Sequence, residues 1–346
     1  MRLSIIVPVY NMAADGKLNF CMDSLVGQTI DDYEIIAVDD ASTDNSLEIL
    51  REYENRFPDK VRVLTYPVNR RQGGAKNEGM RAALGDWIGF IDSDDWVAAD
   101  YYEKLLGKAE ETGADLVGCD YCLVTEHTFC ADAGTVVQNN TMDQTGVLDT
   151  EAHRKLFMRP GSMVIKIYKA SVIRENHLDF PEGIFYEDNC AGSIWSLYFR
   201  HFEKVEEPLY FYYQHGGSTV HYITEEKCRD RMRAAVMLHE ECQERGFADG
   251  YHRELCYRFA ELYYVITLFS YMQGVKGPRL SFVRELQKGV GERFPDFQEN
   301  PYYLKNTGRE EQRLIALQGR TNVGFYLYYR LKMAVRKIRK LRAGLF

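Results

Sequence analysis

Three aspartates stand close together in the segment GFIDSDDW (residues 89–96), within and just after an apolar run that begins at Trp87. Asp92 and Asp94 are two positions apart, so both side chains can point to the same face at the end of a strand. Two hard oxygen ligands with open coordination positions suit Mg²⁺ or Mn²⁺ holding phosphate groups. Asp95 precedes a helical pattern and has the alternative role of capping that helix. The cluster therefore predicts a divalent-metal site, with Asp92 and Asp94 as ligands.

Four apolar runs must position this cluster, and they lie at 3–10, 33–40, 61–67 and 87–92. Helical patterns fill the intervals at 17–27, 42–57 and 73–85, and Ser42 or Thr43 is the expected N-cap of the second helix. Continuous β-branched runs that alternate with helices predict a parallel sheet covered on both faces. The expected fold is therefore α/β, with a Rossmann-like, mostly parallel sheet and flanking helices.

Polar residues follow the strands at the points where they end. They are Tyr10 and Asn11, then Asp39 and Asp40, then Asn69 to Arg71, and finally the aspartate cluster. Ligands of such sheets bind beyond the carboxyl ends of the strands. Four consecutive strands thus predict one binding site along one edge.

The regular alternation of apolar runs and helical patterns becomes less clear after residue 100. We expect strands at 114–124 and 135–138, a strand followed by a short helix at 162–177, and a last strand that runs into a Gly-Gly loop over 209–219. Helical patterns then occupy 225–246, 250–273, 279–292 and 310–342. The prediction is a catalytic α/β domain over residues 1–222 and a helical C-terminal region over 223–346.

Composition excludes several classes of protein. The net charge of −8 argues against general nucleic-acid binding. Neither GxGxxG nor GxxxxGK[ST] occurs, so the chain lacks the usual phosphate cradles of dinucleotide-binding and P-loop proteins. The eight cysteines show no zinc-ligand spacing, and no export signal or run of about 20 apolar residues is present. These features predict a cytoplasmic protein with free thiols.

Six motifs occur in an order and at spacings that resemble glycosyltransferase family 2. They are SIIVPVYN, VDDAST, NRRQGGAKNEG, IGFIDSDD, SMVIKIYK and FPEGIFYEDN, and they span about residues 1–220. The resemblance implies a GT-A fold and an inverting, metal-dependent transfer of sugar from a nucleotide-sugar donor. The QxxRW motif of processive synthases is absent, which favours transfer of one sugar at a time.

The resemblance also implies roles for individual residues. The base and ribose of the donor would be held by Pro8, Tyr10, Asn11 and Asp39, and the base or the diphosphate by Arg71. In the DxD motif Asp92 would lie near the ribose, Asp94 would bind the metal, and Asp95 would lie near the sugar.

The later motifs imply the catalytic groups. Asp188 would be the catalytic base, and Glu187 would orient it or bind the acceptor. Lys166 matches an element beside the site, and His215 matches a loop that closes over the diphosphate or supplies a metal ligand. His215 also fits a purely structural role. Lys76 stands where the family usually has Arg, which keeps the positive charge but loses the bidentate geometry of a guanidinium.

The end of the chain is basic and amphipathic. From Phe325 to Phe346 it carries seven basic and no acidic residues, and an apolar stripe recurs every three or four positions. The stripe is formed by Leu327, Leu331, Ala334, Ile338, Leu341 and Leu345. A helix of this kind, expected at about 323–346, favours peripheral contact with the inner face of an anionic membrane. Packing on the protein's own acidic body or a contact between two copies are the alternatives.

The sequence therefore favours a glycosyltransferase that builds a surface polysaccharide from a nucleotide-sugar, most simply a UDP-sugar, and a glycan or lipid-linked acceptor. A sugar nucleotidyltransferase also uses carboxylates and a metal, but NMAADGK (residues 11–17) is a poor match to its loop after the first strand. The other alternative is a non-catalytic relative that binds nucleotide-sugar. The sugar, the acceptor and the oligomeric state are not encoded in any pattern that we identify.

Overall fold

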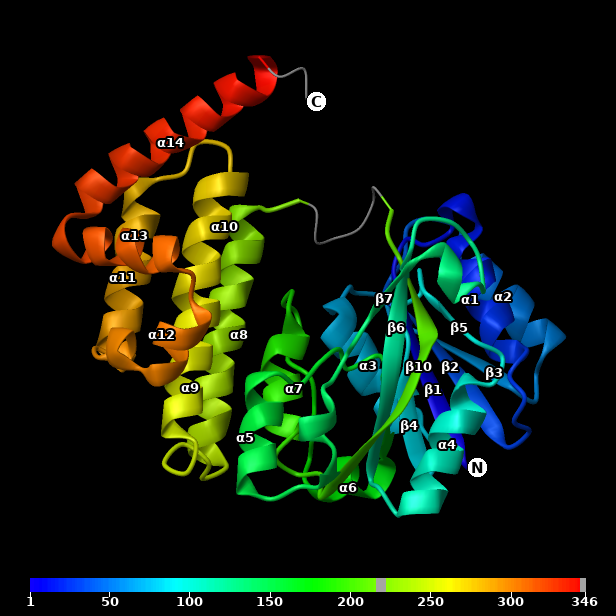
Figure 1. Cartoon of the computed structure of the whole chain (residues 1–346). Helices are drawn as coiled ribbons and strands as arrows, with labels where there is room; N and C mark the ends of the chain where they lie inside the picture. Colours follow the sequence, from blue (N-terminus) through cyan, green and yellow to red (C-terminus); the bar gives the residue numbers. More distant parts are fainter. Residues whose placement is uncertain (216–221, 343–346) are drawn as a thin grey trace. The chain divides into compact units, whose positions relative to one another are not determined.

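The computed structural model describes residues 1–215 and 222–342, with side chains up to Arg336. Two compact units divide the chain, Met1–Ser218 and Thr219–Phe346. Figure 1 shows an α/β first unit and a helical second unit. The loop that was expected to follow His215 falls at residues 216–221, outside the described residues.

The first unit is built on one sheet, whose order is β3-β2-β1-β4-β9-β6-β10-β5. Its first four strands are β1 (Leu3–Val9), β2 (Tyr33–Asp39), β3 (Val61–Thr65) and β4 (Trp87–Phe90). They are parallel to one another, and every residue of β1 and β2 is buried. The continuous apolar runs were correctly interpreted as buried parallel strands, because helices cover both faces of such a sheet.

The second half of the sheet mixes directions. It contains β5 (Trp96–Val97), β6 (Leu116–Val124), β9 (Lys166–Lys169) and β10 (His201–Tyr213). β9 runs antiparallel to both β4 and β6, and β10 is parallel to β6 and antiparallel to β5. Two short strands, β7 (Thr135–Val137) and β8 (Gly146–Val147), pair with β6 and β10. Residues 209–213 of the predicted last strand form the end of the longer β10.

Helices flank this sheet in the first unit (Figure 1). They are α1 (Lys17–Val26), α2 (Ser46–Arg56), α3 (Arg71–Ala82), α4 (Tyr101–Thr112), α5 (Thr150–Met158), α6 (Ala170–Glu175) and α7 (Glu187–Trp195). Helix α3 packs on β1 and β2 and also contacts α7. Gly79 permits the first of these contacts, because a Cβ at this position would lie 2.5 Å from the side chain of Ile6. Helix α3, which follows β3, therefore lies beside α7, which begins at Glu187.

The second unit is helical. Its helices are α8 (Glu225–Glu244), α9 (His252–Phe259), α10 (Thr267–Gly274), α11 (Leu280–Arg293), α12 (Pro301–Asn306), α13 (Arg309–Arg320) and α14 (Asn322–Arg342). A π-helical turn, Ala260–Ile266, joins α9 to α10 and interrupts the single helix that was predicted over 250–273. The helix predicted over 310–342 is broken at Thr321, whose extended backbone separates α13 from α14 and whose Oγ1 accepts from the backbone N–H of Gly324. Within the described residues, no helix combines the length and the apolar character that crossing a bilayer requires.

Candidate active site

The carboxyl ends of β1 to β4 lie next to one another, because the strand order is β3-β2-β1-β4. In this register Val9, Asp39 and Thr65 are directly paired across three neighbouring strands. Tyr10 follows β1 and is exposed, whereas Pro8 is buried inside the strand. The polar residues that follow these strands therefore share one edge.

Asn11 joins the ends of the first two strands. Its backbone N–H donates to Ser42 Oγ (3.0 Å), and its Oδ1 accepts from the backbone N–H of Thr43 (2.8 Å). The prediction that Ser42 or Thr43 caps the next helix was wrong, since α2 begins at Ser46 after Asn45. These two residues shape the edge of the sheet instead. Asn11 and Ala41 both have left-handed backbones (φ 53° and 59°), a conformation that Asn tolerates and Ala rarely adopts.

Asp39 presents an unpaired acceptor at this edge. Its side chain is buried, and Oδ2 accepts from the Ser42 backbone N–H and from Thr65 Oγ1, both at 3.3 Å. Within the described part of the chain, Oδ1 is buried without a hydrogen-bond partner. A buried acceptor without a donor is costly, so this oxygen suits a ligand that brings an N–H or O–H group.

The three aspartates that follow β4 have different surroundings. Asp95 is buried, accepts from Tyr210 Oη (2.6 Å) and from the backbone N–H of Tyr213 (2.8 Å), and so anchors the end of β10. The alternative role of Asp95 as a helix cap was wrong, because α4 begins at Tyr101 after Asp100. Burial, with the charges of Asp94 and Asp92 added, raises the pKa of Asp95 well above its usual value.

Asp94 and Asp92 face other groups. Asp94 Oδ2 lies 2.9 Å from His215 Nε2, and Asp92 Oδ1 accepts from Gln72 Nε2 at 3.0 Å. Burial, together with the charges of Asp94, Glu187 and Asp188 and against the opposing charge of Lys76, raises the pKa of Asp92 to about 6. Carboxylates that raise one another's pKa mark a place where additional positive charge would be stabilised.

The residues at the start of α7 join this acidic group. Glu187 is buried and pairs with the equally buried Lys76, with 2.9 Å between Oε1 and Nζ. Burial disfavours the ammonium charge, but the surrounding carboxylates, Glu187 foremost, outweigh burial and raise the pKa of Lys76. Asp188 is exposed, and its charge acts on both Lys76 and Asp92. The structure thus brings the predicted metal ligands and the predicted catalytic pair into one electrostatically coupled group.

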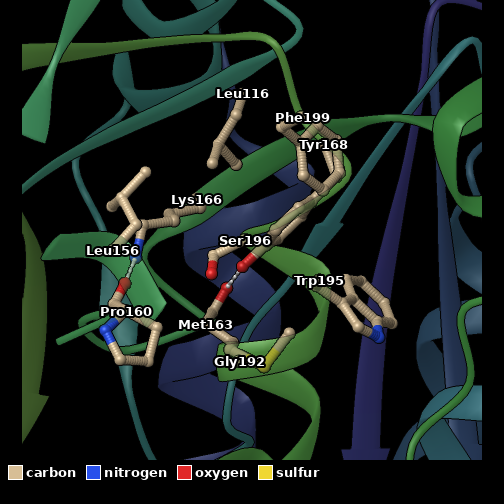
Figure 2. Close-up of a pocket in the computed structure, with 10 residues that line it drawn as sticks. All are labelled: Leu116, Leu156, Pro160, Met163, Lys166, Tyr168, Gly192, Trp195, Ser196 and Phe199. Carbon is tan, nitrogen blue, oxygen red and sulfur yellow. Dashed lines mark hydrogen bonds between the residues drawn. The ribbon is translucent and has the colours of Figure 1, made fainter. Parts of the chain in front are cut away.

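Two other predicted residues contact an aromatic ring and backbone carbonyl groups. The Arg71 guanidinium lies 4.1 Å from the centre of the Phe185 ring, and so faces the segment that precedes α7. Lys166 is buried on β9 and donates to the carbonyl oxygens of Pro160 and Ser162. Figure 2 shows Lys166 among the residues that line a small pocket, with Leu156, Tyr168 and Trp195. These contacts favour a structural role for Lys166 over contact with a donor.

Comparisons with known proteins identify the family of this chain. The model of glycosyl transferase family 2 matches residues 4–129. EpsH of Bacillus subtilis (strain 168) is 31% identical over 320 residues, which cover 88% of this chain and 86% of EpsH. The chain belongs to glycosyltransferase family 2. The uncharacterized glycosyltransferase YibD of Escherichia coli (strain K12) is 32% identical over 224 residues, and the matched part spans 62% of YibD.

Solved structures confirm the fold of this family 2 chain. S. aureus TarS 1-349 in complex with UDP-GlcNAc superposes with a TM-score of 0.66 at 20% identity, and the match covers 100% of this chain and 93% of that one. The mannosyltransferase PcManGT from Pyrobaculum calidifontis, in complex with GDP-Man and Mn²⁺, gives a TM-score of 0.50 at 14% identity over 97% of this chain and 87% of that one. The predicted GT-A fold, with a helical C-terminal region, is therefore correct.

Sequence reasoning missed several residues of this edge. Gln72 holds Asp92 and precedes Lys76 by one helical turn, a spacing that was available as a signal. Tyr210 binds Asp95 from 115 residues away, and no local pattern indicated this contact. The same is true of Glu182, which binds Arg70 across 112 residues.

Proposed function

We propose that this family 2 chain transfers one sugar at a time, with inversion, from a UDP-sugar to a hydroxyl group of a glycan or lipid-linked acceptor in the synthesis of a surface polysaccharide. The observation that carries the proposal is the position of Asp92. It belongs to the strand edge that bears Asp39, and it is electrostatically coupled to Lys76, Glu187 and Asp188. One site therefore combines groups suited to holding a nucleotide with an exposed carboxylate suited to removing a proton.

The donor would lie along the ends of β1, β2 and β4. The free Oδ1 of Asp39 would accept a hydrogen bond from the base or the ribose, and the exposed Tyr10 ring would cover the base. Asn11 would act indirectly, by holding the two loops that border this part of the site. That the UDP-GlcNAc complex of TarS has the same fold supports a UDP-sugar as the donor.

Asp188 would act as the general base. It would take the proton of the acceptor hydroxyl as the oxygen attacks the anomeric carbon from the side opposite the leaving diphosphate. A single displacement of this kind inverts the configuration at the anomeric carbon. Glu187 would keep Lys76 in place, and the ammonium of Lys76 would in turn favour the ionised form of Asp92.

A divalent cation, Mn²⁺ or Mg²⁺, fits the donor set at Asp94 and Asp92. Both offer hard carboxylate oxygens, whereas the oxygens of Asp95 are already taken by Tyr210 and Tyr213. The described residues contain no group of three or more His, Cys, Asp or Glu side chains preformed as a metal centre. Phosphate oxygens of the donor would complete the coordination, and the bound cation would neutralise the diphosphate as it leaves. His215 would then hold Asp94 as a ligand through their 2.9 Å contact.

We also propose that α14 rests on the inner face of the cell membrane. It packs within its unit through Phe325 and Tyr329, which are buried, while Leu327 and Leu331 of the predicted stripe are 61% and 65% exposed. The described part of the stripe therefore does not pack against the rest of its unit. Basic residues occupy neighbouring positions of the same helix. Ile338 and Leu341 carry no described side chain, and Leu345 lies outside the described residues.

A donor-hydrolysis screen tests the proposed function. Purified chain with Mn²⁺ is incubated with UDP-, GDP- and dTDP-sugars, nucleotide release is measured, and thermal shifts are recorded with UDP and with nucleoside triphosphates. We expect stabilisation by UDP and release from a UDP-sugar. Stabilisation by triphosphates alone would instead support a sugar nucleotidyltransferase, and binding of UDP-sugar without release or transfer would support a non-catalytic relative.

A further inference from the structure

The segment 180–187, which leads into α7 and Asp188, is attached along one side of α3. Asn77 makes a two-way contact with it, because its Nδ2 donates to the Phe180 carbonyl (2.9 Å) and its Oδ1 accepts from the Phe180 backbone N–H (2.8 Å). The contact is close enough that a Cβ at Gly73 would lie 2.0 Å from the carbonyl oxygen of Pro181. Only glycine fits at this position without displacing the segment.

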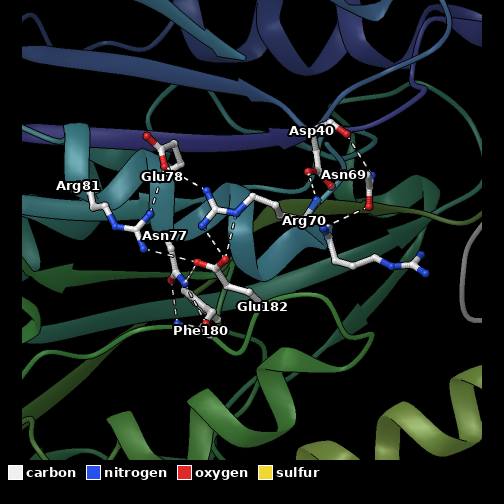
Figure 3. Close-up of polar contacts among 9 residues, drawn as sticks. Asp40, Asn69, Arg70, Asn77, Glu78, Arg81, Phe180 and Glu182 are labelled. Carbon is white, nitrogen blue, oxygen red and sulfur yellow. Dashed lines mark hydrogen bonds and ion pairs between the residues drawn. The ribbon is translucent and has the colours of Figure 1, made fainter. Parts of the chain in front are cut away.

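Glu182 extends this attachment to Arg70. Its Oε2 accepts from Nε and Nη2 of Arg70 (3.0 and 2.6 Å), and its Oε1 accepts from Asn77 Nδ2 (3.0 Å). The backbone N–H of Gly183 donates to the Arg70 carbonyl at 3.0 Å. Figure 3 shows Glu182 between Arg70 and Asn77, with Oε2 accepting from Arg70 and Oε1 accepting from Asn77 and, at 3.5 Å, from Arg81. Because Arg70 donates twice to a carboxylate that also binds Asn77, this contact should stabilise the segment more than an isolated surface ion pair would, since such a pair contributes little on its own.

Arg70 also connects this segment to the donor edge. Its backbone N–H donates to Asp40 Oδ1 at 2.6 Å, and Asn69 Nδ2 donates to the Asp40 carbonyl at 3.0 Å. Asp40 directly follows β2 and Asp39. A continuous set of hydrogen bonds thus runs from the end of β2 through Arg70 and Glu182 to the segment before Asp188.

The segment needs such support because its backbone is strained. Tyr186 has a left-handed conformation (φ 66°), which a residue with a bulky side chain seldom adopts and which persists only where the surroundings enforce it. This turn determines the direction in which α7 begins, and therefore where Glu187 and Asp188 lie.

We infer that Arg70, Asn77 and Glu182 are positioning residues, which hold segment 180–187 so that Asp188 is placed correctly against a donor bound at the β1–β4 edge. This inference rests on the proposed function, in which Asp188 is the base. A small displacement of a reacting group lowers the rate strongly and leaves binding of the donor unchanged. The three residues therefore act on turnover rather than on donor affinity.

The test compares Glu182→Gln with Glu78→Gln. A glutamine amide offers one acceptor oxygen where the carboxylate offers two, so either Arg70 or Asn77 loses its acceptor. Glu78 is the matched control, since its Oε2 accepts from the same Arg70 (3.4 Å) but belongs to α3 itself. For each variant, kcat and KM for the donor are measured together with the donor Kd and the backbone hydrogen exchange of residues 180–188.

We expect Glu182→Gln to lower kcat about tenfold or more, to leave the donor KM and Kd within about twofold, and to speed hydrogen exchange in residues 180–188. Glu78→Gln should change none of these quantities beyond about twofold. The inference is overturned if kcat of Glu182→Gln is unchanged or if hydrogen exchange in residues 180–188 is unchanged. It is also overturned if the fall in kcat is fully explained by a smaller fraction of protein molecules that can bind the donor. If the unmodified chain shows no turnover with any donor, the proposed function fails, while hydrogen exchange still shows whether Glu182 holds the segment.

Discussion

Lys76 and Glu187 are separated by 111 residues in sequence and form a buried ion pair, with 2.9 Å between Nζ and Oε1. The pair joins α3 to the first residue of α7, and so links the helix after β3 to the helix that carries Asp188. Removing one partner from a buried pair leaves an uncompensated charge.

Removing one partner of this pair should therefore destabilise the fold more than replacing both partners with apolar residues. We expect Lys76→Met to lower the free energy of unfolding by about 3 kcal/mol, and the double variant Lys76→Met/Glu187→Leu to lower it less than that. Urea denaturation of the two variants measures both values. Equal destabilisation by the single and double variants would contradict this explanation.

Asp188→Asn should abolish sugar transfer and spare the donor. The amide retains the size of the carboxylate but cannot accept the acceptor proton, so we expect kcat to fall by about 10²- to 10⁴-fold. The donor Kd, measured by calorimetry with a UDP-sugar, should stay within about twofold. Full turnover by Asp188→Asn would show that the base is another group.

The neighbouring carboxylates Asp94 and Asp95 should respond differently to the same substitution. Asp94→Asn should raise the Mn²⁺ concentration needed for half-maximal turnover, and chelation with EDTA should abolish turnover of the unmodified chain. Asp95→Asn should mainly lower the melting temperature, because Asp95 holds Tyr210 and the end of β10. A metal requirement that is the same for Asp94→Asn and the unmodified chain would remove Asp94 from the metal site.

Helix α14 should bind anionic vesicles. We expect the full chain to float with vesicles containing phosphatidylglycerol, less so at high salt, and the double variant Leu327→Asp/Leu331→Asp to float much less. Leu304→Asp is the matched control, because Leu304 is similarly exposed (56%) but lies on α12. Equal flotation of the double variant and the control would favour packing on protein instead.

Lys166 should make stability depend on pH. Burial lowers its pKa to about 7, whereas a lysine in the unfolded chain has a pKa of about 10.4. Between these values the unfolded state binds more protons, so the contribution of Lys166 to stability rises with pH. Between pH 7 and pH 9 the free energy of unfolding of the unmodified chain should rise relative to that of Lys166→Met, by at most about 1.4 kcal/mol per pH unit. A difference that does not change with pH would mean that the ammonium keeps its charge when buried.

The sequence by itself determined the four parallel strands, the helices between them and the edge at which their polar residues meet. Buried parallel strands require unbroken apolar runs, and their carboxyl ends must coincide, so Asp39, Asp92 and Asp94 could be assigned to one site from local pattern alone. The motif spacing likewise indicated the family and the region of Glu187 and Asp188.

Only the tertiary structure decided how the individual side chains are used. Asp95 is bound by Tyr210 rather than capping a helix, Ser42 and Thr43 hold Asn11 rather than capping α2, and Lys166 donates to backbone carbonyls. The contacts of Arg70 with Glu182 and of Lys76 with Glu187 cross more than a hundred residues. Such pairs depend on how α3 and the segment before α7 pack together, and no periodicity within either segment carries that information.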